Sequence, residues 1–497
     1  LVATPCIEML NAASISFALV ALLSDGAIEA LLTAGSDAQK ASYLEPLISG
    51  KWTGTMNLTE PQAGSDIAAV RARAVPQSDG TFRIFGTKIF ITYGEHDMAE
   101  NIVHLVLART PDAPAGVKGI SLFVVPKFLV NADGSLGERN DVHCVSIEHK
   151  LGIKASPTAV LQFGDHGGAI ATLVGEENRG LEYMFIMMNA ARFGVGMQGI
   201  GLAERAYQQA VVFAKDRVQS RALTGSAGPV AIIHHPDVRR MLMSMRARTE
   251  AARALAYVGA ATCDIAHHHP DPATRAAKLA VYEYLVPIIK GCSTEMAQDV
   301  ARDGVQVHGG MGFIEETGAA QHYRDAMILT IYEGTTAIQA NDLVNRKTAR
   351  DGGKTAKAIL AEVRTTELEL AARIECGGSH CADFEAILRQ LAEGSAALEA
   401  VVAFVIGTIK ADVEAVFAGS VLYLRLAGAV LGGWQMARAA LIAQAKLDSS
   451  DADASFYQAK IGTARFYADH ILSQAPSLHS AIVGGSVGVL SLGADQF

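Results

Sequence analysis

The sequence predicts a mostly helical α+β protein in which a central β domain lies between helical regions. Apolar residues recur at helical spacing near the start of the chain and again from about residue 181 onward. Between about residues 51 and 176 this spacing gives way to β-branched and alternating runs separated by Gly, Pro and Asp. We therefore predict a helical N-terminal part, a central β-barrel-like domain, a helical-bundle domain and an extra C-terminal helical domain.

The chain is long enough for several domains. It has 497 residues, of which 50% are hydrophobic, and this supports a large core divided over two to four domains. We place the N-terminal helical domain at 1–50, the β domain at 51–176, the bundle at 177–350 and the C-terminal extension at 351–497. Gly352 and Gly353 mark the last of these boundaries.

Local patterns predict the individual elements. In the N-terminal part we expect helices over 15–22, 26–34 and 37–47, the last capped by Ser36. In the β domain we expect extended segments at 53–59, 81–86, 88–92, 101–109, 119–126 and 160–163. In the bundle we expect helices over 181–216, 237–267 and 274–301, followed by an apolar helical segment that leads to Glu333.

The C-terminal extension predicts four further helices, at about 355–375, 384–417, 419–447 and 452–474. The stretch from Val413 to Ala445 is apolar enough to raise the question of a membrane span. Arg425 and Arg438 interrupt it, and its longest uncharged piece is too short to cross a bilayer. We therefore predict a buried helix there and no transmembrane segment.

Composition excludes some classes of function. The net charge of −9 and the lack of a basic patch with interleaved aromatic residues argue against nucleic-acid binding. The six cysteines form no secreted-type framework, so we expect a reducing cytoplasm. Cys376, His380 and Cys381 lack a second ligand pair, and we predict no metal site.

Because the sequence begins at Leu1 without a charged leader, we expect that upstream sequence is missing and that targeting cannot be assessed from it.

Three motifs contain most of the candidate catalytic and binding residues. They are Leu58-Thr59-Glu60-Pro61-Gln62-Ala63-Gly64-Ser65-Asp66, Gln306-Val307-His308-Gly309-Gly310-Met311-Gly312-Phe313 and Ile331-Tyr332-Glu333-Gly334-Thr335-Thr336. Taken alone, a Glu at a helix end is usually a solvated surface charge. The glycines of the second motif lie between predicted helices and not after a strand, so they do not indicate a Rossmann nucleotide site.

Together and in this order, the motifs resemble those of the acyl-CoA dehydrogenase family, and the resemblance covers residues 1 to about 348. It implies that Glu333 is the base that removes the α-proton of an acyl-CoA thioester, while the β-hydride passes to a bound flavin. This proton is weakly acidic, so the site must stabilise the developing enolate and raise the basicity of the carboxylate by burial. Some branches place the acid just before Arg192, but Ala191 stands there in this chain.

The resemblance implies FAD as the cofactor and assigns its contacts. One set lies in the predicted β domain: Met56, Leu58, Thr59, Gly64, Ser65, Phe90 and Thr92. A second set would complete the flavin of a neighbouring subunit or contact its adenosine: Arg217, Gln306, Gly309, Gly310 and Thr335. The substrate contacts implied are Ser65, Arg192 and Gly334. Most relatives have Trp at the position of Phe90, which keeps an apolar face but loses the indole donor.

Other departures put particular adenosine contacts in doubt. This chain has Asn57 where the family usually has a small residue, Gln321 where a basic residue is usual, and Ala337 where Gln is common. The resemblance nevertheless implies an oxidoreductase that forms a trans-2-enoyl-CoA, with an electron-transfer flavoprotein as acceptor. It also implies a homodimer or homotetramer.

The sequence of residues 54–66, together with the C-terminal extension, most resembles the 3-methylmercaptopropionyl-CoA branch of the family. Three alternatives remain open at this point: a medium- or long-chain acyl-CoA dehydrogenase, an acyl-CoA oxidase that uses O₂, and a non-catalytic helical scaffold.

Overall fold

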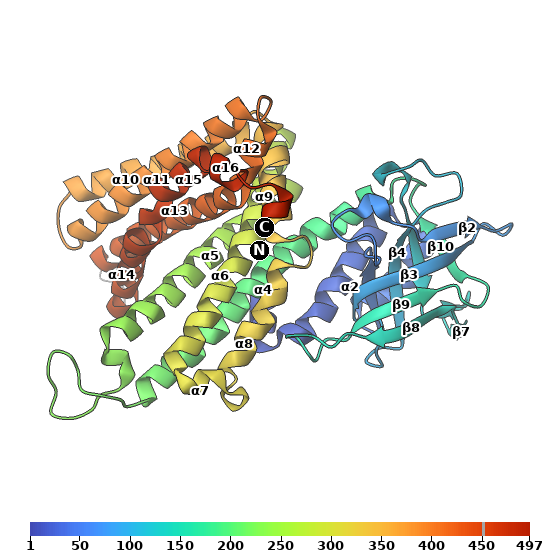
Figure 1. Ribbon diagram of the computed structural model, residues 1–497, viewed down its shortest axis with the longest axis horizontal. Coiled ribbons are helices and arrows are strands. Elements are labelled where there is room, and N and C mark those ends of the chain that lie inside the picture. The colour runs from blue at the N-terminus through green and yellow to red at the C-terminus, as the bar shows by residue number, and fades with distance from the viewer. Residues whose placement is uncertain (450–452) are drawn as a thin grey trace. The chain divides into compact units, whose positions relative to one another are not determined.

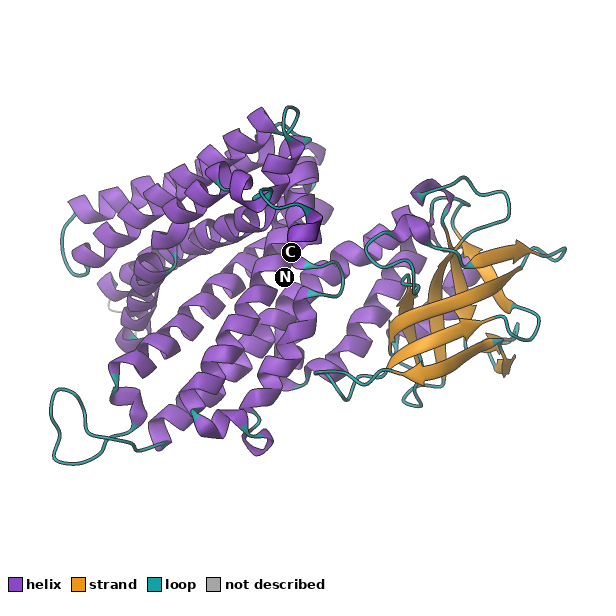
Figure 2. Ribbon diagram, viewed as in Figure 1, coloured by secondary structure: helices purple, strands orange, loops and turns teal. Residues whose placement is uncertain are grey.

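A computed structural model describes residues 1–449 and 453–497, and it confirms the mostly helical α+β fold class (Figure 2). The chain forms two compact units. The β unit is Ser14–Gly194, and the helical unit combines Leu1–Ala13 with Val195–Phe497. The long helix α4 (Gly180–Asp216) contributes residues to both. The four-part division at 50, 176 and 350 remains a prediction.

The β unit contains an eight-stranded sheet with the order β1-β4-β5-β10-β3-β9-β8 and with β2 beside β3. Among the strands that the structure describes, β1 and β4 pair in parallel and the other pairs of this sheet are antiparallel. Among the described strands no pairing joins β1 to β8, so the barrel-like character of the sheet remains a prediction. The strands of the sheet are β1 (Trp52–Asn57), β2 (Arg73–Pro76), β3 (Phe82–Thr92), β4 (Asn101–Ala108), β5 (Ser121–Pro126), β8 (Val142–Ile147), β9 (Thr158–Phe163) and β10 (Ala169–Val174), and β6 (Phe128–Val130) pairs separately with β7 (Leu136–Arg139).

The central strands of this sheet are buried on both faces. Along β4, Val103 and Leu105 pack into one core with α2 (Ile15–Ala34) and α3 (Asp37–Ile48), whereas Val106 and Ala108 pack into a second core with β3, β9 and β10. Successive side chains of a strand point to opposite faces, so a strand between two cores needs apolar residues throughout. This explains why residues 102–108 are apolar except for the buried His104.

Two boundaries in the β unit differ from the prediction. Residues 15–22 and 26–34 form one helix, α2, because Gly26 packs against Met56 and Met187 inside it and does not end it. Residues 81–86 and 88–92 form one strand, β3, whose pairing with β9 is interrupted by a bulge between Lys88 and Ile91. The sequence did not predict the strands β2, β6, β7, β8 and β10.

The helical unit is built on α4, α5 (Pro236–His268) and α6 (Pro272–His308), which confirms the long helices predicted for the bundle. Small residues allow α4 and α6 to pack closely. A Cβ at Gly199 would lie 2.6 Å from the carbonyl oxygen of Ser293, and one at Gly196 would lie 2.7 Å from Ile289. The short helices α1 (Ala3–Ala13), α7 (Gly310–Phe313), α8 (Ala319–Ala326) and α9 (Thr336–Asp342) complete this part.

The C-terminal extension packs onto α5 and α6 within the same compact unit (Figure 1). The Tyr423 hydroxyl is buried between those of Tyr284 (3.2 Å) and Thr348 (2.9 Å), which joins α13 (Ser420–Asp448) to α6 and to the π-helix η6 (Leu343–Ala349) that precedes the extension. The predicted helices are present, although 384–417 is divided and the predicted start at 452 lies outside the described residues. Their bounds are α10 (Lys354–Glu375), α11 (Cys381–Thr408), α12 (Val413–Ala418), α13 (Ser420–Asp448), α14 (Ala454–His470), α15 (Ala475–Gly484) and α16 (Ser486–Val489).

Three helices are long and apolar enough to cross a membrane by length and composition: α2, α11 and α13. Between 44% and 67% of the apolar window of each is buried inside the protein. The absence of a transmembrane segment therefore remains a prediction.

The β unit contains a buried histidine that makes its stability depend on pH. Burial lowers the pKa of His104 to about 3, and its Nδ1 lies 2.8 Å from Thr55 Oγ1. The unfolded chain binds a proton below about pH 6.5 while the folded protein does not, so acid favours unfolding. We expect His104 to cost about 2 kcal/mol of unfolding free energy between pH 7 and pH 5. Denaturant titrations of the wild type and His104→Gln at both values measure this cost; equal losses in the two proteins would contradict it.

Candidate functional site

Glu333 lies in the helical unit, in a loop between the 3-10 turn η5 (Met327–Thr330) and α9. The helical segment predicted to lead to it ends earlier, because α8 stops at Ala326 and gives way to this turn. Glu333 has φ 52° and Gly334 has φ 91°, so two consecutive residues are left-handed. For a residue with a Cβ this conformation costs free energy and persists only where surrounding contacts impose it.

The contacts that hold this loop come from Lys290 and Gln339. Lys290 is 0% exposed on α6, and its Nζ donates to the carbonyl of Gly334 at 2.6 Å. Gln339 Nε2 lies 3.3 Å from the carbonyl of Glu333 and 3.2 Å from that of Gly334. A Cβ at Gly334 would come within 2.7 Å of the same Nε2 atom, so glycine is required there. The carboxylate of Glu333 is therefore carried on a rigid backbone.

Tyr332 and Leu329 give this loop an apolar, neutral setting. Leu329 is fully buried, and the Tyr332 hydroxyl donates to Gln198 Oε1 at 2.5 Å. Burial, assisted by the charge of Glu333, raises the pKa of Tyr332 well above its usual range, so this phenol stays protonated. Glu333 itself is half-buried.

Thr335, a predicted adenosine contact, is the N-cap of α9. Its Oγ1 accepts the main-chain N–H of Ile338 at 3.3 Å, which leaves the hydroxyl hydrogen for another partner. The next residue, Thr336, donates to Glu295 Oε1 at 2.5 Å. Both threonines therefore fix the start of the helix that follows Glu333.

In the β unit, the segment Leu58–Asp66 is held by a buried ion pair. Lys88 is 0% exposed, and its Nζ lies 2.8 Å from Glu60 Oε1 and 3.1 Å from the carbonyl oxygen of Leu58. Glu60 also accepts the main-chain N–H groups of Arg71 (2.8 Å) and Ala72 (3.0 Å). Burial lowers the pKa of Lys88 to about 8, while the charge of Lys88 and these hydrogen bonds outweigh burial and lower that of Glu60.

The β3 bulge places further predicted flavin contacts beside this segment. The main-chain N–H of Ile89 donates to the carbonyl of Thr59 at 3.0 Å. The next residue, Phe90, has φ 59° and a 59% exposed side chain, and Thr92 ends the strand. Bulges commonly re-aim side chains next to ligand sites. The structure therefore joins the segment that holds Thr59 to the bulge that holds the exposed Phe90, through the residue before Phe90.

The other predicted contacts in the β unit differ in accessibility. Gly64 and Ser65 are exposed, and a Cβ at Gly64 would meet nothing within 4 Å. Met56 is only 7% exposed and packs in the core, so its side chain offers no free surface and any flavin contact would use its main chain. Arg192 is 4% exposed on α4. Asn57, where the family usually has a small residue, is also buried. Its Nδ2 donates to Thr55 Oγ1 at 2.8 Å.

The contacts expected to serve a neighbouring subunit are exposed. Arg217 follows the end of α4, and Gln306, Gly309 and Gly310 lie at the end of α6. These two helix ends lie at the same end of the bundle (Figure 1). Gly309 has φ 60°, and no atom lies within 4 Å of a Cβ built there or at Gly310. The surface is therefore open to another molecule.

Sequence reasoning missed Lys88 and Lys290. Lys88 lies within the largely apolar run Ile84–Ile91, and Lys290 directly follows the apolar run Leu285–Ile289. This is the signal that could have revealed them. A lysine in such a place is rarely fully buried unless it has a partner. Each donates to a main-chain carbonyl of a predicted site motif, Leu58 or Gly334, and Lys88 also pairs with the carboxylate of Glu60.

Comparison with protein families accounts for most of the chain. Residues 55–166 match the acyl-CoA dehydrogenase middle domain, 178–348 the acyl-CoA dehydrogenase C-terminal domain, and 359–492 the acetyl-CoA dehydrogenase C-terminal-like family.

Individual relatives agree with these matches. The chain is 56% identical over 476 residues, covering 96% of it and 79% of the relative, to 3-methylmercaptopropionyl-CoA dehydrogenase of Ruegeria pomeroyi. It is 31% identical over 309 residues, covering 62% and 72%, to the CarC subunit of the caffeyl-CoA reductase–Etf complex of Acetobacterium woodii.

Among solved structures, the C11-CoA complex of ACDH-11 from Caenorhabditis elegans shares the fold with a TM-score of 0.71. The similarity covers 94% of this chain and 75% of that one at 21% identity. It therefore extends through the C-terminal extension as well as the bundle and the β unit. The chain belongs to the acyl-CoA dehydrogenase family.

Proposed function

We propose that this protein is an FAD-dependent acyl-CoA dehydrogenase that converts 3-methylmercaptopropionyl-CoA to its trans-2-enoyl thioester. The observation that carries the proposal is the rigid, left-handed placement of Glu333, supported by Lys290 and Gln339. The choice of acyl group is supported by the 56% identical relative from Ruegeria pomeroyi.

The residues of the β unit fit a flavin. Phe90 has an exposed aromatic side chain and follows Ile89, which hydrogen bonds to Thr59, and a flavin ring that packs on Phe90 would cover it. Gly64 and Ser65 lie on an exposed turn where main-chain amides could approach phosphates. When bound, FAD supplies the acceptor for the β-hydride.

The chain's own residues supply the proton transfer. Glu333 takes the α-proton, and its fixed backbone avoids the cost of ordering the base during the reaction. The neutral Tyr332 adds no charge beside it. Arg192, Ser65 and Gly334 are the proposed substrate contacts.

We extend the proposal to partners and location. An electron-transfer flavoprotein is the proposed acceptor, supported by the relative from Acetobacterium woodii that belongs to an Etf complex. A homodimer or homotetramer is supported by the exposed set Arg217, Gln306, Gly309 and Gly310, which our assignment gives to a neighbour's FAD. We place the protein in the cytoplasm, a location supported by its six free cysteines.

Anaerobic titration of the FAD-loaded protein tests the substrate. We expect 3-methylmercaptopropionyl-CoA to bleach the visible flavin absorbance faster than butyryl-, octanoyl- or palmitoyl-CoA. Faster bleaching by a straight-chain thioester would replace the substrate but keep the dehydrogenase. No bleaching by any thioester, with FAD bound, would contradict the proposed reaction. Oxygen consumption in a parallel aerobic assay would identify an oxidase.

Replacement of the base tests the role of Glu333. We expect Glu333→Gln to retain FAD and to lower kcat by about 10²–10⁴-fold, because the amide cannot accept the proton. Stopped-flow absorbance measures the rate of flavin reduction. Glu316→Gln, an exposed carboxylate in the same unit, is the matched control. A near-normal rate in Glu333→Gln would place the base elsewhere.

Substitutions in the buried ion pair of Glu60 and Lys88 test whether this pair positions Leu58–Asp66, the segment proposed to contact the flavin. Glu60→Gln leaves Lys88 buried without its counter-charge, and we expect a loss of about 3–5 kcal/mol in unfolding free energy together with weaker FAD binding. Glu60→Gln combined with Lys88→Met should recover most of the stability but not the FAD affinity, because Leu58 loses its Nζ donor. Denaturant unfolding and flavin fluorescence measure the two effects. FAD affinity equal to wild type in both variants would show that the pair does not position the segment.

A further inference from the structure

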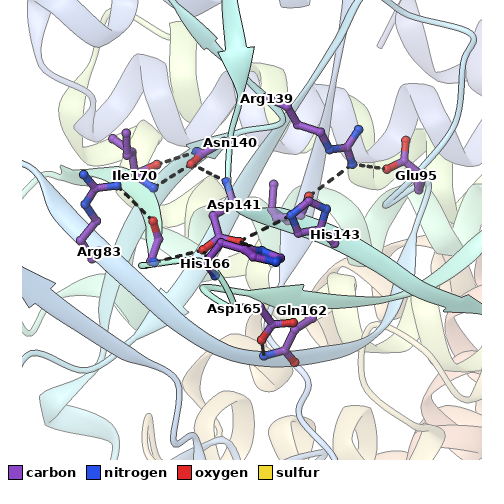
Figure 3. A network of polar contacts seen from close by, with 12 residues as sticks. Arg83, Glu95, Arg139, Asn140, Asp141, His143, Gln162, Asp165, His166 and Ile170 are labelled. Atoms are coloured by element: carbon purple, nitrogen blue, oxygen red, sulfur yellow. Dashed lines mark hydrogen bonds and ion pairs between the residues drawn. The ribbon is translucent and has the colours of Figure 1, made fainter.

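We propose a second site, unconnected with the flavin chemistry, at which Asp141, His143 and His166 bind a divalent transition metal such as Zn²⁺. Asp141 precedes β8, His143 lies on it, and His166 lies in the turn between β9 and β10, so all three belong to the β unit. Figure 3 shows the two imidazoles facing the carboxylate of Asp141. The sequence predicted no metal site because His143 and His166 are brought together only by the pairing of β8 with β9.

The distances between the ligand atoms suit a tetrahedral ion. Asp141 Oδ1 lies 3.2 Å from His166 Nδ1 and 3.5 Å from His143 Nε2. One ligand atom from each residue lies within 4.8 Å of the other two. Zinc binds histidine nitrogen and carboxylate oxygen at about 2.0–2.2 Å, and the ligands of a regular tetrahedron are then about 3.3–3.6 Å apart. The two separations from Asp141 are therefore close to those of such a site, and a bound ion would replace the hydrogen bond between Asp141 and His166.

The carboxylate is oriented before any ion binds. Asp141 Oδ2 accepts the main-chain N–H groups of His166 at 2.7 Å and of Gly168 at 3.0 Å, so the other oxygen, Oδ1, is directed at the imidazoles. Although burial opposes it, these hydrogen bonds lower the pKa of Asp141 and keep it ionised. Hydrogen bonds of this kind orient the ligands of known metal sites.

Among the described residues, the neighbouring charged side chains hydrogen bond to groups other than the Asp141 carboxylate, which faces the two histidines of the cluster. Arg139 donates to Glu95 Oε2 at 3.0 Å and to the carbonyl of Val142 at 3.3 Å, and Arg83 donates to the carbonyl of Gly168 at 3.1 Å (Figure 3). Asp165 accepts from Gln162 at 3.0 Å. No arginine hydrogen bond to Asp141 is present among the described residues, so an incoming cation does not have to displace one.

Accessibility and donor type select the class of ion. The His143 and His166 side chains are 42% and 77% exposed, so an ion can enter from solvent and keep water as a fourth ligand. Two imidazoles with one carboxylate favour zinc, nickel or copper over calcium or magnesium, which prefer oxygen. A bound ion would clamp β8 to the β9–β10 turn and stabilise the β unit as its concentration exceeds Kd.

Calorimetric titration of the FAD-loaded full chain with Zn²⁺ tests the site. Because Cys376, His380 and Cys381 could bind zinc as well, every protein carries Cys376→Ser and Cys381→Ser. We expect one ion per chain, and we expect His143→Gln and His166→Gln each to weaken binding more than about tenfold. His149→Gln, an exposed histidine outside the cluster, is the matched control and should bind as tightly as the parent.

A second readout separates a site from adventitious binding. Saturating Zn²⁺ should raise the Tm of the parent and of His149→Gln but not that of His143→Gln. Absence of binding in the parent, or equal affinity in the parent and in both cluster variants, would overturn the proposal. Neither measurement depends on turnover, so a failure here is distinct from a failure of the dehydrogenase assignment.

Discussion

Two fully buried lysines support the two predicted site segments. Lys88 holds the carbonyl of Leu58 in the β unit, and Lys290 holds the carbonyl of Gly334 in the helical unit. Burying an ammonium group is costly unless its hydrogen bonds are satisfied, so each lysine can adopt its position only when the loop carbonyl is in place. Each lysine therefore ties its segment to the strand or helix that carries it.

This coupling explains how an irregular backbone is tolerated at both segments. Glu333 and Phe90 both have positive φ, which costs free energy for residues other than glycine. Glu333 precedes Gly334, whose carbonyl accepts from the buried Lys290, and Phe90 follows Ile89, whose main-chain N–H donates to the carbonyl of Thr59. Such fixed geometry is useful for an enzyme that must place a base and a hydride acceptor on the same substrate, because it reduces the ordering cost of the reaction.

The C-terminal extension contributes to the same helical unit. The buried hydroxyls of Tyr284, Thr348 and Tyr423 connect it to α6, the helix that also carries Lys290. Close packing adds to this connection, since a Cβ at Gly428 of α13 would clash with Cys292 of α6. The extension thus stabilises the helix on which the Glu333 loop depends.

The sequence by itself determined the order of the helical and β regions, the three motifs and the family, because apolar periodicity and short motifs are local properties of the chain. It predicted Glu333 and Thr59 but not the residues that hold their segments. Lys88 pairs with Glu60 28 positions away, Lys290 with Gly334 44 positions away, and His166 with Asp141 25 positions away. The left-handed backbone of Glu333, the bulge at Phe90 and the Asp–His–His cluster likewise follow from strand register and helix packing. Only the tertiary structure decided these features, because the contacts that stabilise them exist only once distant segments have packed together.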